Sequence, residues 1–78
     1  MPRFFFNIYD DVVVDDEEGL ELPDAEAARR EGIRSARALA CEQVLQGHLN
    51  VNHRIEVQDE DRRRIATIRF GEAVSIEN

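Results

Sequence analysis

The side chains best suited to nucleophilic or metal chemistry are one cysteine and two histidines, namely Cys41, His48 and His53. The two histidines are five residues apart, a spacing that matches no local zinc pattern. Cys41 and His48 would need a third group to orient the imidazole, and none is evident. No serine or threonine lies in a G-x-S-x-G context, and there is no glycine-rich phosphate loop. The sequence therefore predicts a protein without enzymatic activity, catalytic residues, metal ligands or a cofactor.

Four consecutive acidic residues, Asp15 to Glu18, precede Gly19. Carboxylates are ligands that calcium and magnesium prefer, so this run could hold a divalent cation. It lacks the alternating ligands and the closing glutamate of an EF-hand loop. A solvated turn is the favoured interpretation, and a cation site at residues 15–18 remains an alternative.

Arginines gather in two places, a stripe on a predicted helix and a run of three in a predicted turn. These candidates for docking an anion are Arg30, Arg34, Arg37, Arg62, Arg63 and Arg64. The chain has 10 basic and 17 acidic residues, which gives a formal net charge of −7. A negative field opposes nonspecific binding to nucleic acids and to anionic membranes. We interpret both groups as solvated surface charge, and keep a regulatory nucleic-acid-binding role as an alternative.

The arginine stripe lies on a helix that the sequence predicts over about residues 24–46. Asp24 is a good N-cap, and Gly47 can end the helix in the left-handed conformation. One side of the helix consists mostly of small residues: Ala25, Ala28, Gly32, Ile33, Ala36, Leu39, Ala40 and Val44. Such a face allows a close approach, so the layer that it covers must supply the bulky side chains. Gly32 is the residue with the weakest helix propensity.

Strands are predicted on both sides of the helix. Residues 3–9 and 12–14 have the composition of a first hairpin, and residues 54–59 and 64–70 of a second. The order is β-β-α-β-β, which predicts an α+β fold. We expect a two-layer sandwich, in which a four-stranded antiparallel sheet of two hairpins carries the helix on one face. The first strand is the most apolar, and we place it centrally.

The first strand, RFFFNIY, presents apolar side chains on both of its faces. Because side chains alternate along a strand, Phe4, Phe6 and Ile8 share one side, which we assign to the helix-covered face. Phe5 and Tyr9 then lie on the open face. An exposed aromatic pair is the best candidate for a self-association surface.

The chain of 78 residues is long enough for one small domain, over residues 1–78 with no linker. We expect residues 71–78 to form a loosely packed tail. The single cysteine excludes an intrachain disulfide, and no apolar stretch approaches the roughly 20 residues needed to span a bilayer. The N-terminus leads directly into a strand without the pattern of a signal peptide. A cytoplasmic protein is the expectation.

Three stretches together resemble a known family. They are the opening Pro2–Phe6, the segment DEEGLELPD at residues 16–24, and the closing Ile55–Glu60 with Ile68–Phe70. In these stretches the sequence resembles short uncharacterised bacterial proteins known as a domain of unknown function, over nearly the whole chain. It departs from them at both hairpin turns, which lack glycine here. The resemblance implies a small cytoplasmic bacterial protein, and it implies no activity.

The leading hypothesis is a non-enzymatic protein that works by protein–protein contact, as a homodimer or with an unidentified protein partner. The contact would use Phe5 and Tyr9 or an exposed edge strand. The alternatives are nucleic-acid binding by the arginines and cation binding by residues 15–18.

Overall fold

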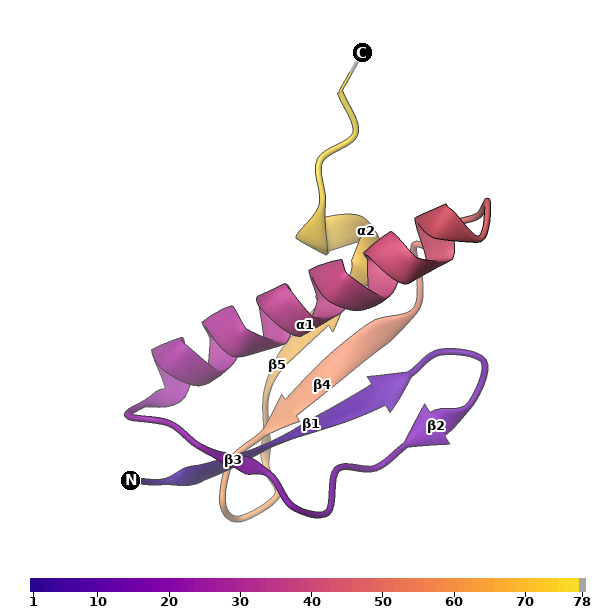
Figure 1. The fold of residues 1–78 in the computed structure, drawn as a ribbon. Coiled ribbons are helices and arrows are strands. Elements are labelled where there is room, and N and C mark those ends of the chain that lie inside the picture. The colour runs from indigo at the N-terminus through magenta and orange to yellow at the C-terminus, as the bar shows by residue number, and fades with distance from the viewer. Residues whose placement is uncertain (78) are drawn as a thin grey trace.

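An antiparallel sheet and one long helix form the two layers of the computed structural model, which describes residues 1–77 (Figure 1). The strands are β1 (Arg3–Tyr9), β2 (Val13–Val14), β3 (Leu20–Glu21), β4 (Arg54–Gln58) and β5 (Arg64–Arg69), and the helices are α1 (Ala25–Leu45) and α2 (Phe70–Ala73). The sheet order is β2-β1-β4-β5, and β3 also pairs with β1. The predicted α+β sandwich and the central place of β1 are confirmed. The sheet gains β3, which the sequence did not predict as a strand.

Helix α1 begins and ends where the sequence predicts. The Asp24 carboxylate accepts a hydrogen bond from the backbone N–H of Ala27 at 2.8 Å. Gly47, with φ of 94°, follows the C-terminal turn in the left-handed region that glycine tolerates. The residues that α1 buries are a row of small ones, Ala28, Gly32, Ala36 and Ala40. Ala25 and Val44, predicted on the same face, are exposed because the row leaves the sheet at both ends.

Gly32 fixes how closely α1 approaches the sheet. A Cβ atom built on Gly32 would lie 2.6 Å from Cδ1 of Ile68 and 2.8 Å from Cγ2 of Val57. Both contacts are shorter than van der Waals packing allows, and Val57 is fully buried. The residue with the weakest helix propensity is therefore required here by packing.

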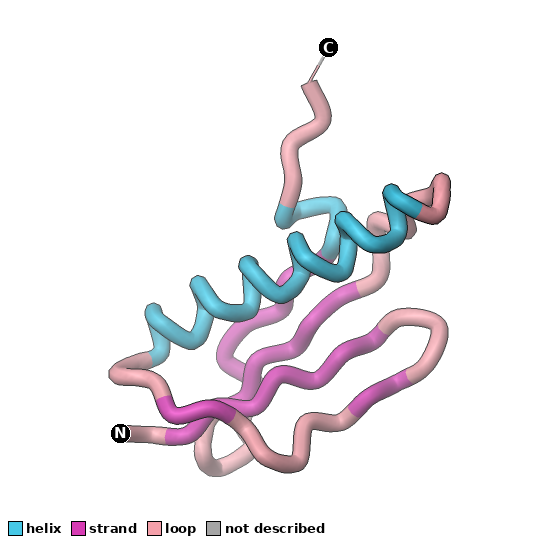
Figure 2. Tube along the Cα trace, in the orientation of Figure 1, coloured by secondary structure: helices cyan, strands magenta, loops and turns pink. Residues whose placement is uncertain are grey.

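The cover that α1 gives to the sheet is incomplete. Helix α1 packs on β4, β5 and α2, whereas β2 and the loop after it project beyond the helix (Figures 1 and 2). A helix with its side chains is about 10–12 Å wide. Four strands at about 4.8 Å spacing need nearly twice that width. One helix consequently leaves β2 and the adjoining Phe6 and Ile8 of β1 incompletely covered, whereas Phe4, nearer the start of β1, is buried in the core.

The C-terminal segment begins with a short helix. Phe70 and Ala73 of α2 are buried, and the Ala73 carbonyl accepts a hydrogen bond from Nε of Arg37 at 2.7 Å. The backbone N–H groups of Phe70 and Gly71 donate to the carbonyls of His53 and Val51, which hold the start of α2 beside the loop that precedes β4. Val74 is half-buried and Ile76 is exposed. Asn78, the last residue of the predicted tail over residues 71–78, lies outside the described residues.

Candidate interaction surfaces

The open face of the sheet is not the apolar surface that the sequence predicts. Phe5 is only 9% exposed. The Arg62 guanidinium lies 3.5 Å from the centroid of its ring, a cation–π contact. The backbone of Gly19 also approaches it, since a Cβ at that glycine would lie 3.0 Å from Cδ1 of Phe5. The expectation of an exposed Phe5 is wrong, because two segments distant in sequence cover the ring.

Tyr9, the second residue of the predicted self-association pair, is half-buried. The Arg54 guanidinium lies 4.4 Å from the centroid of its ring. Nε of Arg54 also donates a hydrogen bond to Oε2 of Glu56 at 3.0 Å. Self-association through Phe5 and Tyr9 stays a prediction, but guanidinium groups cover both rings.

Asp16 gives the acidic run a structural role. Its Oδ2 accepts a hydrogen bond from the backbone N–H of Phe6 at 3.0 Å. Its Oδ1 accepts from the N–H groups of Glu18 and Gly19, at 3.2 and 3.0 Å. Its own N–H donates to Oδ1 of the buried Asn7 at 2.8 Å. β1 pairs with β3 at Arg3 and Phe4 and with β2 at Ile8 and Tyr9. Between these two regions, the Asp16 carboxylate accepts the N–H group of Phe6 in place of a strand.

The other carboxylates of the run, Asp15, Glu17 and Glu18, are exposed. Within residues 1–77, no group of three or more His, Cys, Asp or Glu side chains is placed to hold a metal ion. Asp16, the most enclosed member of the run, already accepts three N–H groups. Its oxygens would have to release these donors to bind a cation.

The six candidate arginines do not form one surface. Arg30, Arg34 and Arg37 line a shallow hollow of about 460 Å³ on α1, together with Ala27, Glu31 and Ile33. Arg34 pairs with Glu31 at 3.5 Å, and Arg37 is bonded to Ala73.

The turn arginines lie elsewhere, in the hairpin between β4 and β5. Arg62 has a φ of 63°, covers Phe5 and donates from Nη1 to the Asp16 carbonyl at 3.0 Å. It lies on the open face, opposite the layer of α1. Arg63 and Arg64 are exposed. The structure therefore groups the helix arginines with one another and separates them from Arg62.

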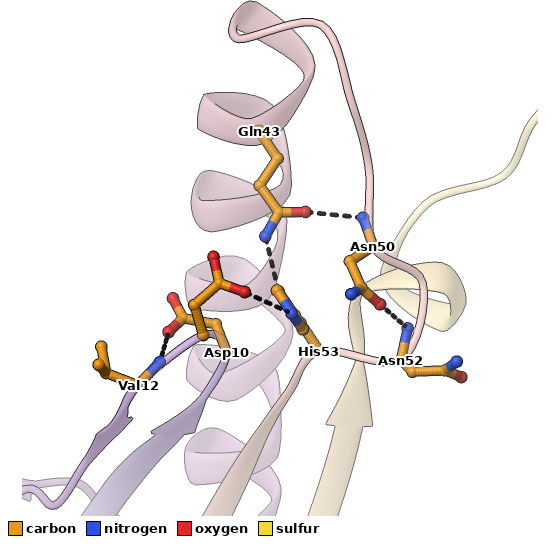
Figure 3. Close-up of polar contacts among 7 residues, drawn as sticks. Asp10, Val12, Gln43, Asn50, Asn52 and His53 are labelled. Atoms are coloured by element: carbon orange, nitrogen blue, oxygen red, sulfur yellow. Dashed lines mark hydrogen bonds and ion pairs between the residues drawn. The ribbon is translucent and has the colours of Figure 1, made fainter.

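Gln43 and His53 join the end of α1 to the loop before β4 (Figure 3). Oε1 of Gln43 accepts from the backbone N–H of Asn50 at 2.8 Å, which fixes the orientation of the amide. Its Nε2 then donates to Nδ1 of His53 at 2.8 Å. The proton of the neutral imidazole accordingly lies on Nε2, which faces Oδ1 of Asp11 at 3.7 Å.

This network was not predicted from the sequence, from which we expect surface or capping roles for the two histidines. The His53 ring also packs edge-on against the buried Phe70, with centroids 5.8 Å apart. Cys41 and His48, weighed above as a nucleophile–base pair, line two different hollows. His53 thus has a structural role, since its contact with Gln43 links the loop before β4 to α1.

Two further hollows expose aliphatic side chains of the described residues, and the second of them also carries acidic residues. We call the first the tail-side patch: it is a hollow of about 390 Å³ lined by Arg37, Ala40, Cys41, Val44, Leu49, Val74 and Ile76. We call the second the β1–β2 hollow: it measures about 460 Å³ and is lined by Phe6, Ile8, Val14 and residues 15–19. The sequence predicted neither surface.

The resemblance noted in the sequence is confirmed by comparison with protein families. Residues 3–71 match the family described as Domain of unknown function (DUF6894). The chain belongs to this family. The DUF6894 match spans every strand, α1 and the beginning of α2. No curated protein and no solved structure matches the chain. The family description assigns no activity. The surfaces of the molecule are therefore the basis for a proposed function.

No helix within residues 1–77 combines the length and the apolar character that crossing a membrane requires.

Proposed function

We propose that this DUF6894 protein acts without catalysis, through protein–protein contact, and that it self-associates through the tail-side patch. The observation that carries the proposal is the exposure of large aliphatic side chains at and beside this patch. Within the patch, Val44 is 59% exposed and Ile76 is 81% exposed. Leu45, next to Val44 in the chain but outside the lining of the patch, is also 81% exposed. Contiguous apolar surface of this kind marks interaction sites in folded proteins.

Charge favours a second copy as the occupant of the tail-side patch. The net charge of −7 makes two copies repel each other, so contact between them is most favourable where carboxylates are absent. The lining of the patch contains Arg37 and no acidic residue. The patch therefore gives two acidic chains a place to make contact without opposing carboxylates.

The size of the chain supports the same proposal. A domain of 78 residues buries only about 60% of the surface of its unfolded chain, so its core is thin. Small domains commonly gain stability by oligomerisation. A two-fold axis through the patch would bring Val44 and Ile76 of each copy against the same surface of the other.

The proposal includes a bacterial cytoplasmic setting. Cys41, a free and exposed thiol, lies within the patch. A reducing compartment keeps such a thiol from forming intermolecular disulfides.

The test is the absolute mass in solution, measured by light scattering on a sizing column at two salt concentrations. The chain mass is 9.0 kDa, and we expect a value near twice that, insensitive to salt. Val44→Asp should yield a monomer, because it places a carboxylate in the apolar contact. Val12→Asp is the matched control, since Val12 is 66% exposed but lies outside the patch. A monomeric parent protein, or a Val44→Asp variant that stays dimeric, contradicts the proposal.

A further inference from the structure

We infer that the β1–β2 hollow binds a basic amphipathic helix of a partner protein. This inference goes beyond self-association, and it concerns a different surface from the tail-side patch. It rests on three observations: the hollow has an apolar floor, it lies on the part of the sheet that α1 is too narrow to cover, and it has an acidic rim.

The floor of the hollow lies on the same side of the sheet as α1. Phe6 pairs with Val57 and Ile8 with Ile55, and both partners are fully buried beneath the helix layer. Ile8 also pairs with Val14, which extends the apolar surface onto β2. Phe6 and Ile8 are only half-buried, and Val14 is 49% exposed. The apolar side of the sheet therefore continues beyond the edge of α1.

The dimensions of the sheet favour a helix as the occupant. Helix α1 covers about half of the width of four strands, as its diameter requires. A second helix laid beside it would cover the remaining half and complete the layer. Binding of an amphipathic helix in an apolar groove is a common mode of peptide recognition, with anchors at i, i+3, i+4 and i+7.

The rim of the hollow determines the charge of the partner. Asp15, Glu17 and Glu18 are exposed, and none of them forms an ion pair with another residue of the described chain, 1–77. Near the other end of β1, a smaller hollow of about 160 Å³ is lined by further acidic residues, Asp10, Asp11 and Glu42. Lys or Arg on the flanks of a helix would complement carboxylates at both ends.

A second copy of this chain does not fit the β1–β2 hollow. The apolar row of α1 is buried in its own core, so α1 cannot also provide anchors for another molecule. The net charge of −7 would also oppose an approach to the acidic rim. The occupant must be a different protein with a basic helix.

The experiment uses a fluorescent synthetic peptide of about 15 residues, which is about 23 Å long when helical. It carries Leu at i, i+3, i+4 and i+7, and Lys elsewhere. We expect saturable binding, measured by anisotropy with the Val44→Asp protein, whose monomeric state would remove self-association from the result. A peptide with Glu in place of Lys should not bind. A scrambled Leu/Lys peptide of the same charge should bind at least about tenfold more weakly.

Two adjacent valines give the matched pair of variants. Val14→Asn places a polar group on the floor and should weaken binding by about tenfold. Val13→Asn should leave binding unchanged, because Val13 pairs with Tyr9 on the opposite face although it is 61% exposed. Thermal melts establish that both variants fold. Absence of binding, equal affinity for the scrambled peptide, or equal effects of the two variants would overturn the inference.

Because the peptide is titrated against a protein carrying Val44→Asp, the two proposals can fail separately. A monomeric parent protein contradicts self-association and leaves the binding result intact. A dimeric parent protein, together with a Val44→Asp variant that does not bind the peptide, contradicts only the role of the β1–β2 hollow.

Discussion

The two faces of the sheet at β1 both differ in their cover from what the sequence suggests. On the open face, Phe5 was expected to be exposed, but Arg62 and Gly19 cover it. On the helix side, Phe4, Phe6 and Ile8 were expected beneath the helix. Phe4 is buried in the core, whereas Phe6 and Ile8 are only half-buried and line a hollow beside α1. Alternation along the strand correctly assigns each side chain to a face. It does not say which face will be covered.

The difference lies in what can reach each face. An arginine side chain can cover an aromatic ring from a turn that is distant in sequence, and a loop held by one carboxylate can lie across a strand. A helix is a cylinder of fixed width, and Gly32 holds α1 against Val57 and Ile68. Separate side chains and a loop therefore cover the open face. On the other face, the covered part of the sheet extends only as far as the width of α1.

Phe5→Ala tests the comparison most strongly. The ring is buried between Arg62 and Gly19, so its loss should leave a cavity and lower the free energy of unfolding by about 3–4 kcal/mol. An exposed Phe5 would cost less than about 1 kcal/mol. Urea denaturation of the parent protein and the variant distinguishes the two. A small loss would mean that the open face is as accessible as the sequence suggests.

Asp16→Ala should lower the free energy of unfolding by about 2–3 kcal/mol, because it removes the acceptor for the N–H groups of Phe6, Glu18 and Gly19. Asp15→Ala is the neighbouring control, and it should change stability by less than about 0.5 kcal/mol. The measurement is the midpoint of chemical denaturation for both variants. Equal effects would show that the run acts only through its total charge.

Gly32→Ala should lower the free energy of unfolding by about 1 kcal/mol. The gain in helix propensity is about 1 kcal/mol, but the new methyl group must displace Val57 or Ile68, and such overpacking costs about 1–3 kcal/mol. Ala38→Gly, at an exposed position of α1, provides the reference for propensity alone. Thermal melts measure both. A stabilised Gly32→Ala protein would mean that α1 is free to shift toward β1.

Val14→Thr should have the smallest effect, within about 0.5 kcal/mol of the parent protein, because the side chain has no covering layer. The same urea titration measures it. A loss above about 1 kcal/mol would show that the chain itself fills the hollow, and would remove the basis for a partner there.

Local patterns predicted much of this fold. The capping residues Asp24 and Gly47 marked the limits of α1, and alternation gave the facing of both hairpins. Patterns failed where one side chain meets a distant backbone. Asp16 was predicted to be a solvated acid, and its contact with Phe6 depends on a loop path that no short window of sequence contains. The Gln43–His53 bond depends in the same way on the return of the chain to the end of α1.

The sequence by itself determined α1 and four of the five strands of this DUF6894 protein, because helix caps, turn residues and the periods of strands and helices are local properties. It also determined the negative charge that opposes nucleic-acid binding. It did not predict β3 or α2. The tertiary structure alone decided which apolar side chains stay exposed. That outcome depends on the width of α1 and its close approach at Gly32, and on the reach of Arg54 and Arg62 across the opposite face. These are distances between elements, and a linear pattern carries no information about them.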